Sequence, residues 1–146
     1  MSDPPGTILG MRGRAQGDGS TPKDSRRDFW GVNLDAPDAH ALADFYGELL
    51  GWEIDKKDPQ DAYLTPPDGV AYMAFQTNHD YVRPVWPAQP GEQQMMLHLD
   101  FEVTDLAAAV EHAVELGAEE AGYQPQANVR VMLDPAGHPF CLYRAG

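Results

Sequence analysis

The sequence is poor in cysteine, in basic residues and in long apolar runs, and each shortage excludes a kind of site, segment or partner. Its 146 residues include one cysteine, which rules out a disulfide within the chain and a zinc site built from several cysteines. No apolar run approaches the roughly 20 residues of a membrane span, and the N-terminus lacks the apolar stretch of about 7–15 residues of a secretory signal. We therefore expect a cytoplasmic protein.

Charge narrows the range of partners. The chain has 10 Lys and Arg against 23 Asp and Glu, a net charge of −13. An acidic surface repels nucleic acid and anionic membranes, so neither is an expected partner. Residues 1–28 hold five basic and four acidic residues, so residues 29–146 carry −14. Gly, Pro and small polar residues dominate residues 1–28, which predicts a flexible N-terminal tail ahead of a folded domain over 29–146.

The folded part repeats itself. Residues 32–38 and 99–105 both alternate apolar and polar side chains and then reach an aspartate, Asp38 or Asp105, 67 residues apart. Alternation is typical of a half-buried strand, and the aspartate suits a helix N-cap. Apolar residues at helical spacing follow each aspartate, and each predicted helix stops at a glycine, Gly51 or Gly117.

The two copies also end alike. Pro67-Asp68-Gly69 and Pro135-Ala136-Gly137 each precede an apolar strand candidate, 68 residues apart. Shorter strand candidates lie at residues 52–56, 62–65 and 129–133. Each copy therefore predicts strand, helix and three strands, a βαβββ module, within an α+β fold. The first module covers about residues 29–77 and the second about 95–146. The long connector at 78–94 is either a functional lid or subunit contact, or a plain linker with Trp86 packed on the core.

The repeat resembles the vicinal oxygen chelate superfamily, which includes glyoxalase I, extradiol dioxygenases and bleomycin-resistance proteins. The resemblance covers about residues 29–144 and is closest to the glyoxalase-like branch. It rests on Asp38, Phe45-Tyr46, Leu50-Gly51-Trp52, residues 98–105, Leu116-Gly117-Ala118 and residues 134–140. It implies that the paired modules form a cupped mixed sheet around a cleft, often in a homodimer. In metal-dependent members, each module places one metal ligand in its first strand and one, usually Glu, in its last.

Strand parity predicts which side chains face the cleft. If Leu99, Phe101 and Val103 face the helix, their neighbours point into the cup. The same alternation is applied to the first strand and to both final strands. The expected cleft residues are Asn33, Asp35, Met73, Phe75, His98, Asp100, Cys141 and Tyr143, with Gly31 and Glu102 on the same side. Gln76 is expected on the face opposite to Met73 and Phe75.

The implied ligand positions are then Gly31, Met73, His98 and Cys141. Glycine offers no ligand atom, and methionine suits hard or borderline ions poorly. His98 and Cys141 alone do not supply the three protein ligands of a catalytic site. We therefore expect no cofactor. If a divalent metal binds, the ligands are His98 with Cys141 or Asp100.

Some chemistry remains open without a metal. His98 and Asp100 could form an acid/base pair, in which case His98 is the catalytic residue. Alternatively, His98 only lines the wall of the cleft. Cys141 is either a nucleophile or a small buried residue. His40 and His112 on the helices and His138 in a turn are expected at the surface, and His79 near the cleft.

Two functions fit these residues. The aromatic residues Trp30, Phe75, Trp86 and Tyr143, beside carboxylates, suit a planar neutral or cationic ligand, although ordinary packing also explains them. The first function is binding of such a small molecule, as in bleomycin-resistance proteins. The alternative is a lyase, isomerase or dioxygenase-like enzyme that uses His98 with a non-standard metal or none.

Overall fold

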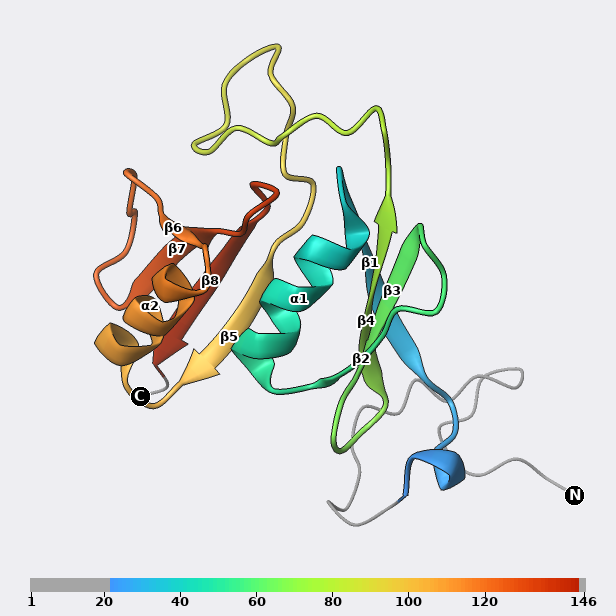
Figure 1. Ribbon diagram of the computed structural model, residues 1–146. Coiled ribbons are helices and arrows are strands. Elements are labelled where there is room, and N and C mark those ends of the chain that lie inside the picture. The colour runs from blue at the N-terminus through green and yellow to red at the C-terminus, as the bar shows by residue number, and fades with distance from the viewer. Residues whose placement is uncertain (1–21, 145–146) are drawn as a thin grey trace, which may run out of the picture.

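The computed structural model describes residues 22–144, so residues 1–21 of the predicted tail lie outside the described residues (Figure 1). The first module contains β1 (Trp30–Ala36), α1 (Ala39–Leu50), β2 (Glu53–Asp55), β3 (Asp61–Thr65) and β4 (Ala71–Thr77). The second contains β5 (Leu99–Val103), α2 (Leu106–Glu115), β6 (Glu119–Glu120), β7 (Val129–Leu133) and β8 (Pro139–Arg144). The α+β fold with two βαβββ modules is confirmed. The position of β6 was not predicted, because two exposed glutamates show no alternation.

Each module folds into its own four-stranded mixed sheet. The strand orders are β1-β4-β3-β2 and β5-β8-β7-β6. The first strand of each module runs parallel to its last, β1 beside β4 and β5 beside β8, and the other pairs are antiparallel. Over the described residues no strand ladder joins the two sheets, so β1 and β5 each end a sheet.

Aspartates start both helices, as the repeat predicts. Asp38 Oδ1 accepts hydrogen bonds from the backbone N–H groups of His40 at 3.0 Å and Ala41 at 3.3 Å. Asp105 Oδ1 accepts one from Ala108 at 3.0 Å. These carboxylates satisfy N–H groups that have no partner within the helix. Gly51 ends α1 in the left-handed conformation, with φ 71°. Neither helix is long and apolar enough to cross a membrane.

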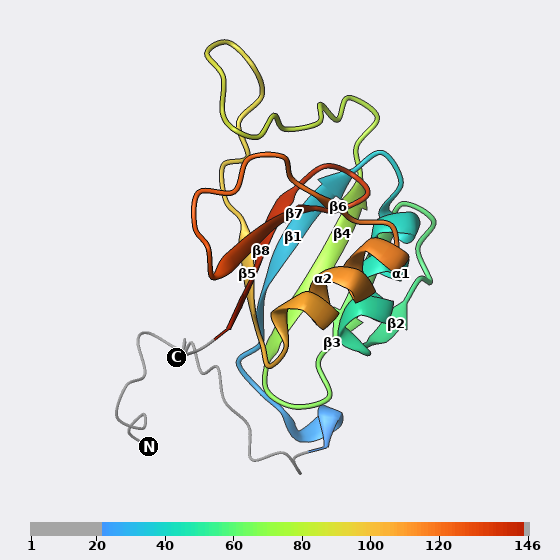
Figure 2. The same ribbon diagram turned by 90° about the vertical axis from the view of Figure 1, so that its left-hand side faces the viewer.

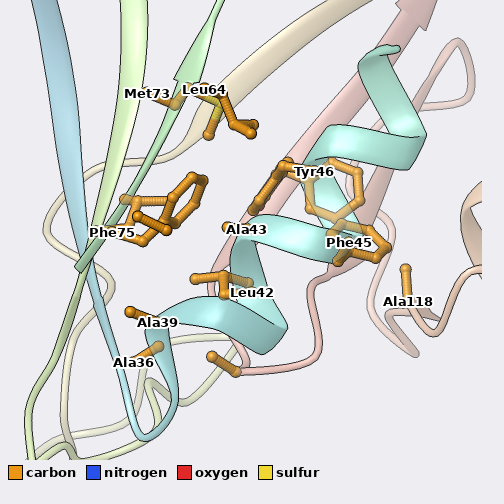
Figure 3. Close-up of a cluster of buried hydrophobic side chains, with 14 of the residues drawn as sticks. Ala36, Ala39, Leu42, Ala43, Phe45, Tyr46, Leu64, Met73, Phe75 and Ala118 are labelled. Atoms are coloured by element: carbon orange, nitrogen blue, oxygen red, sulfur yellow. The ribbon is translucent and has the colours of Figure 1, made fainter. Parts of the chain in front are cut away.

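Helix α1 lies between the two sheets and joins their cores (Figure 1). Tyr46 stacks on Phe75 of β4, with ring centroids 5.9 Å apart. The same ring contacts Phe101 of β5 and Phe140 of β8 at 6.4 and 6.0 Å. Figure 3 shows Phe75 and Tyr46 within this buried cluster. Helix α2 is peripheral by comparison, because among its residues only Ala113 is buried.

Two further segments pack against the modules. Residues 22–28, predicted as tail, include Arg26, which is only 8% exposed and donates hydrogen bonds to the carbonyls of Pro66, Pro67 and Gly69. In both views the connector lies beyond one end of the two sheets (Figures 1 and 2). Trp86 of the connector donates its indole N–H to the carbonyl of Tyr123 in the second module, at 3.2 Å. Trp86 therefore attaches the connector to a surface loop.

Candidate functional site

The side of each sheet that faces away from α1 carries the predicted polar residues. In β5, Asp100 and Glu102 are exposed, whereas the alternate residues Leu99, Phe101 and Val103 are partly buried and pack on the core. In β1, Asn33 is exposed while Leu34 is buried. The parity argument therefore placed the first strand of each module correctly.

The same argument is wrong for β4. Met73 and Phe75 were predicted to face the cleft, but they are 4% and 0% exposed in the core shared with α1 (Figure 3). The ladders explain the error. Val32 pairs with Met73 just as Leu99 pairs with Phe140, so the counterpart of Cys141 is Ala74.

The turn accounts for this one-residue slip. Met73 lies four positions after Gly69, whereas Phe140, its equivalent in the ladders, lies three positions after Gly137. Aligning the turns therefore shifts β4 by one residue, and such a shift moves every side chain to the other face. Gln76, on the opposite face from Met73 and Phe75 as predicted, consequently lies on the outward side.

The first module has no ligand side chain at the position equivalent to His98. That position is Gly31, and the ring of Tyr72 lies over it. A Cβ atom added at Gly31 would be 2.5 Å from the Tyr72 carbonyl oxygen and 2.7 Å from its ring. The close approach of Tyr72 explains why glycine occupies this position.

In the second module, His98, Asp100 and Cys141 form one group. Each offers a ligand atom within 4.8 Å of the others. His98 Nε2 lies 3.1 Å from Asp100 Oδ1, so the predicted His–Asp pair is present. Asp100 pairs with Cys141 across the β5–β8 ladder, and the thiol is hydrogen-bonded to its carboxylate. Glu102 and Tyr143 pair at the next position of the same face.

The state of the thiol bears on what this group can do. Partial burial raises the pKa of the Cys141 thiol, and the charge of Asp100 and its hydrogen bond raise it further. A carboxylate neighbour thus favours the thiol over the nucleophilic thiolate. The surroundings of Cys141 do not resemble an activated nucleophile.

The three donors nevertheless fit a borderline metal ion. Imidazole nitrogen, carboxylate oxygen and cysteine sulfur are all zinc ligands, and catalytic zinc sites commonly have three protein ligands. A cation at this position would also favour the thiolate form of Cys141. Asp100 completes a set that His98 and Cys141 could not form alone.

A cavity of about 310 Å³ lies between β1 and β5 and brings residues of both modules together. Asn33 and Asp35 line it from the first module, and His98 from the second. Met96, of the segment before β5, and His138 of the β7–β8 turn also line it. Of the eight predicted cleft residues, the structure thus gathers three around one cavity. Asp100 and Cys141 join His98 in the adjacent group.

Asp35 is held in position by two neutral amides. The side-chain N–H groups of Gln76 and Asn78 donate to its two oxygens at 2.6 and 3.0 Å. Within residues 22–144 no lysine or arginine forms an ion pair with it. The cavity therefore has a fixed carboxylate whose charge no cation of the described residues balances.

The sequence analysis missed a buried polar network at His138, which was expected at the surface. Its side chain is only 17% exposed, and Nδ1 lies 2.8 Å from Oδ2 of Asp134. Asp134, 1% exposed, also accepts the hydroxyl hydrogen of Tyr46 at 2.7 Å and the backbone N–H groups of Ala136 and His138 at 2.9 Å. The repeated Pro-x-Gly turn was visible in the sequence, but not its contact with α1.

The buried carboxylate of Asp134 contributes to the pKa values of two tyrosines. Burial, followed by the charge and hydrogen bond of Asp134, raises the pKa of Tyr46 well above its usual value. Burial raises the pKa of Tyr81 to about 12, with Asp134 and Asp35 adding to the rise and Arg83 opposing it. The Tyr81 hydroxyl donates to the carbonyl of Ala136 at 2.7 Å. Both phenols therefore stay protonated and act as donors.

The remaining aromatic and histidine residues singled out in the sequence lie outside the cavity and the group around His98. Trp30 is 49% exposed at the start of β1, and Tyr143 is half-buried. His40 is half-buried, its Nε2 lying 2.8 Å from the carbonyl oxygen of Asp58. His112 and His79 are exposed, as is Tyr123, which Trp86 contacts. The predicted aromatic cluster of Trp30, Phe75, Trp86 and Tyr143 is thus dispersed over the molecule.

Comparison with known proteins identifies the family. A family profile described as a glyoxalase-like domain matches residues 31–143. The chain belongs to this family. The match spans both modules of this glyoxalase-like chain, and the resemblance to the vicinal oxygen chelate superfamily is confirmed. Among curated proteins, none matches the sequence.

Solved structures share the fold at low sequence identity. A glyoxalase/bleomycin resistance protein/dioxygenase family enzyme from Burkholderia phytofirmans PsJN is 16% identical, with TM-score 0.59, covering 78% of this chain and 95% of its own. A glyoxalase-related enzyme from Fulvimarina pelagi is 19% identical, with TM-score 0.58 and coverage of 82% and 89%. The fosfomycin resistance protein FosX from Mesorhizobium loti is 11% identical, with TM-score 0.59 and coverage of 83% and 94%. These likenesses support the fold and assign no reaction.

Proposed function

We propose that this glyoxalase-like chain binds a small neutral or cationic molecule, aromatic ligands included, in the cavity between β1 and β5. The observation that carries the proposal is the lining of that cavity. Asn33, Asp35 and His98 come from both modules, and among residues 22–144 no lysine or arginine lines the cavity. Its volume, about 310 Å³, lies at the lower end of the range typical of small-molecule sites.

A thermal-shift screen tests this proposal, because a ligand that binds only the folded state raises its melting temperature. The screen should contain neutral, cationic and anionic compounds of similar size. We expect stabilisers only among the neutral and cationic compounds, and we expect His98→Ala to reduce their effect. His112→Ala, which removes an exposed histidine from α2, is the matched control. Stabilisation by anions alone would refute the proposal.

The group of His98, Asp100 and Cys141 favours a second candidate, an enzyme that uses His98 with a non-standard metal. These three residues would hold the ion, which when bound would act as a Lewis acid toward a substrate oxygen. Without an ion, His98 would instead orient the substrate or move a proton, as its pairing with Asp100 permits.

Elemental analysis of freshly purified protein separates the two candidates. Near-stoichiometric zinc, nickel, manganese or iron that is lost in both His98→Ala and Asp100→Asn would favour the metal enzyme. If both variants retain the metal, the metal site lies elsewhere in the protein. Protein without metal that also fails to take up zinc in equilibrium dialysis would exclude this candidate. Asp55→Asn on β2 makes the same charge change at a distant exposed site and is the control.

We also propose that the chain is a homodimer located in the cytoplasm. The free edges of β1 and β5 and the exposed Tyr63 on the outward face of the first sheet support a self-association surface. Sedimentation equilibrium of the full chain tests the assembly, and a monomer at micromolar concentration would contradict it. Cell fractionation tests the location.

A further inference from the structure

Two neighbouring cavities share one wall. The cavity of about 310 Å³ between β1 and β5 and a second one of about 240 Å³ under the connector are both lined by Asp35, Met95, Met96 and His138. Because four residues border both spaces, the cavities are two parts of one groove. This junction groove runs between the two modules and beneath the connector.

The junction groove carries negative charge. Asp35 lines both parts and Asp80 lines the part under the connector, and neither lining contains a lysine or arginine from the described part of the chain. The amides of Gln76 and Asn78 orient Asp35 but leave its charge unbalanced. A fixed, half-buried carboxylate without a partner cation attracts a cationic group.

His138 adds a hydrogen-bond acceptor to the same wall. The Asp134 carboxylate beside its Nδ1 is acceptor-only, so Nδ1 carries a proton, and in the neutral form of the imidazole this is the only ring N–H. The Nε2 atom is then an acceptor. Its neighbour Tyr81, whose oxygen is 3.4 Å away, gives its own proton to the carbonyl of Ala136. Nε2 thus keeps its lone pair for a donor in the groove.

The methionines give the groove an apolar side. Met96 has φ 64°, and the Leu97 N–H donates to the Met95 carbonyl across it at 2.7 Å. This is the strained form of a γ-turn, which costs free energy for a residue with a side chain. Met96 is nevertheless 82% exposed, so burial does not offset that cost. The turn instead holds an apolar, adaptable side chain at the groove.

We propose that the junction groove binds a primary alkylammonium group, as part of the ligand that the proposed function requires. The ammonium donates hydrogen bonds to Asp35 and to His138 Nε2, and the alkyl chain lies along Met95 and Met96. A primary ammonium has three N–H donors on a compact charge, which suits several acceptors arranged around it. The inference rests on the proposed function and specifies its ligand class.

The test uses n-hexylammonium chloride, with n-hexanol and sodium hexanoate as neutral and anionic probes of matched length. The full chain is labelled with ¹³C at its methionine methyl groups and titrated at constant ionic strength. We expect hexylammonium to shift the signals of Met95 and Met96, while the other two probes bind at least about tenfold more weakly. Affinity should rise roughly threefold per methylene from butyl- to hexylammonium.

Variants assign the contacts. Asp35→Asn should weaken hexylammonium binding by at least about tenfold. Asp55→Asn, the matched charge control on exposed β2, should leave it unchanged. Met96→Gly removes an exposed side chain and relieves the positive φ, so the protein should fold while the dependence on chain length becomes weaker, because Met95 remains.

The outcomes are distinct. Equal binding of hexanol and hexylammonium, or unchanged binding in Asp35→Asn, would overturn the alkylammonium inference. If neutral compounds stabilise the protein in the thermal-shift screen while alkylammonium ions do not bind, the inference fails and the proposed function stands. If no neutral or cationic compound binds in either experiment, both fail.

Discussion

At the scale of single residues, burial and a neighbouring carboxylate together raise the pKa of Cys141 and of Tyr81. Burial has the larger effect in both, and Asp100 adds to it at Cys141, as Asp134 and Asp35 do at Tyr81. Neither effect is visible in the sequence, because the partners are 41, 53 and 46 positions away. Strand pairing and a turn bring them together.

Cys141 should alkylate slowly at neutral pH. It is the single cysteine of the chain, so a thiol reagent reports on it alone. Its raised pKa leaves little thiolate near pH 7. Asp100→Asn removes the negative charge, so iodoacetamide should react several-fold faster, with the pH–rate curve moved to lower pH. Asp55→Asn should leave the curve unchanged, and an equal change there would refute the role of Asp100.

Tyr81 should contribute to stability at alkaline pH in a defined direction. Its pKa is about 12 in the folded chain against 10 as the ordinary value. Between pH 10 and 12 only the unfolded chain loses this proton, so the free energy of unfolding falls as pH rises through that window. The contribution is present in full below pH 10 and lost above 12.

Urea unfolding at several alkaline pH values measures this loss. Tyr81→Phe should show a shallower decline, and part of it should remain because the pKa of Tyr46 is also raised. Tyr63→Phe, which alters an exposed tyrosine on β3, is the control. An unchanged slope in Tyr81→Phe would contradict the assignment.

At the scale of elements, the two helices have the same spacing of apolar residues but different surroundings in the fold. Both start at an aspartate and both show helical spacing, so the sequence predicted them equally well. Helix α1 buries six residues between two sheets, whereas α2 buries Ala113 alone. The sequence could not show which helix lies at the centre of the core, because both modules have the same helical spacing of apolar residues.

Removal of each N-cap should therefore have different consequences. Asp38→Ala should lower the global free energy of unfolding by about 1 kcal/mol, since α1 packs against both sheets. Asp105→Ala removes one N-cap bond from a peripheral helix, so faster hydrogen exchange should be confined to α2. Glu48→Ala, at an exposed position of α1, should change little. Uniformly faster exchange in Asp105→Ala would contradict this picture.

At the scale of the whole molecule, the two modules share one core. Phe140 of the second module lies 6.0 Å from both Phe45 and Tyr46 of the first, measured between ring centroids. A repeat that could have produced two independent units instead forms a single cluster around α1. The modules should therefore unfold together.

Phe140→Ala tests this cooperativity. The change should cost about 3–5 kcal/mol and destabilise both sheets by the same amount. Hydrogen exchange at amides of β3 and β7 reports on the two sheets separately. Phe29→Ala, which truncates a 41% exposed ring, should have a small effect. Loss of protection in β7 alone would show that the modules are independent.

The two modules, the aspartates that cap their helices and the polar side of β1 and β5 were predictable from the sequence, because they depend on local spacing and on alternation along a strand. It also located His98, Asp100 and Cys141. It failed at Met73 and Phe75, since a single extra residue after a turn reverses the faces of a strand and only the ladder reveals it.

Other features depend on how distant segments pack together. The junction groove, the unbalanced charge of Asp35 and the buried pair of Asp134 and His138 all join segments that are distant in sequence. The packing of α1 between the sheets creates these contacts. The shortage of basic residues in the sequence is evident in this groove, which has a carboxylate in its wall and no lysine or arginine among the described residues of its lining.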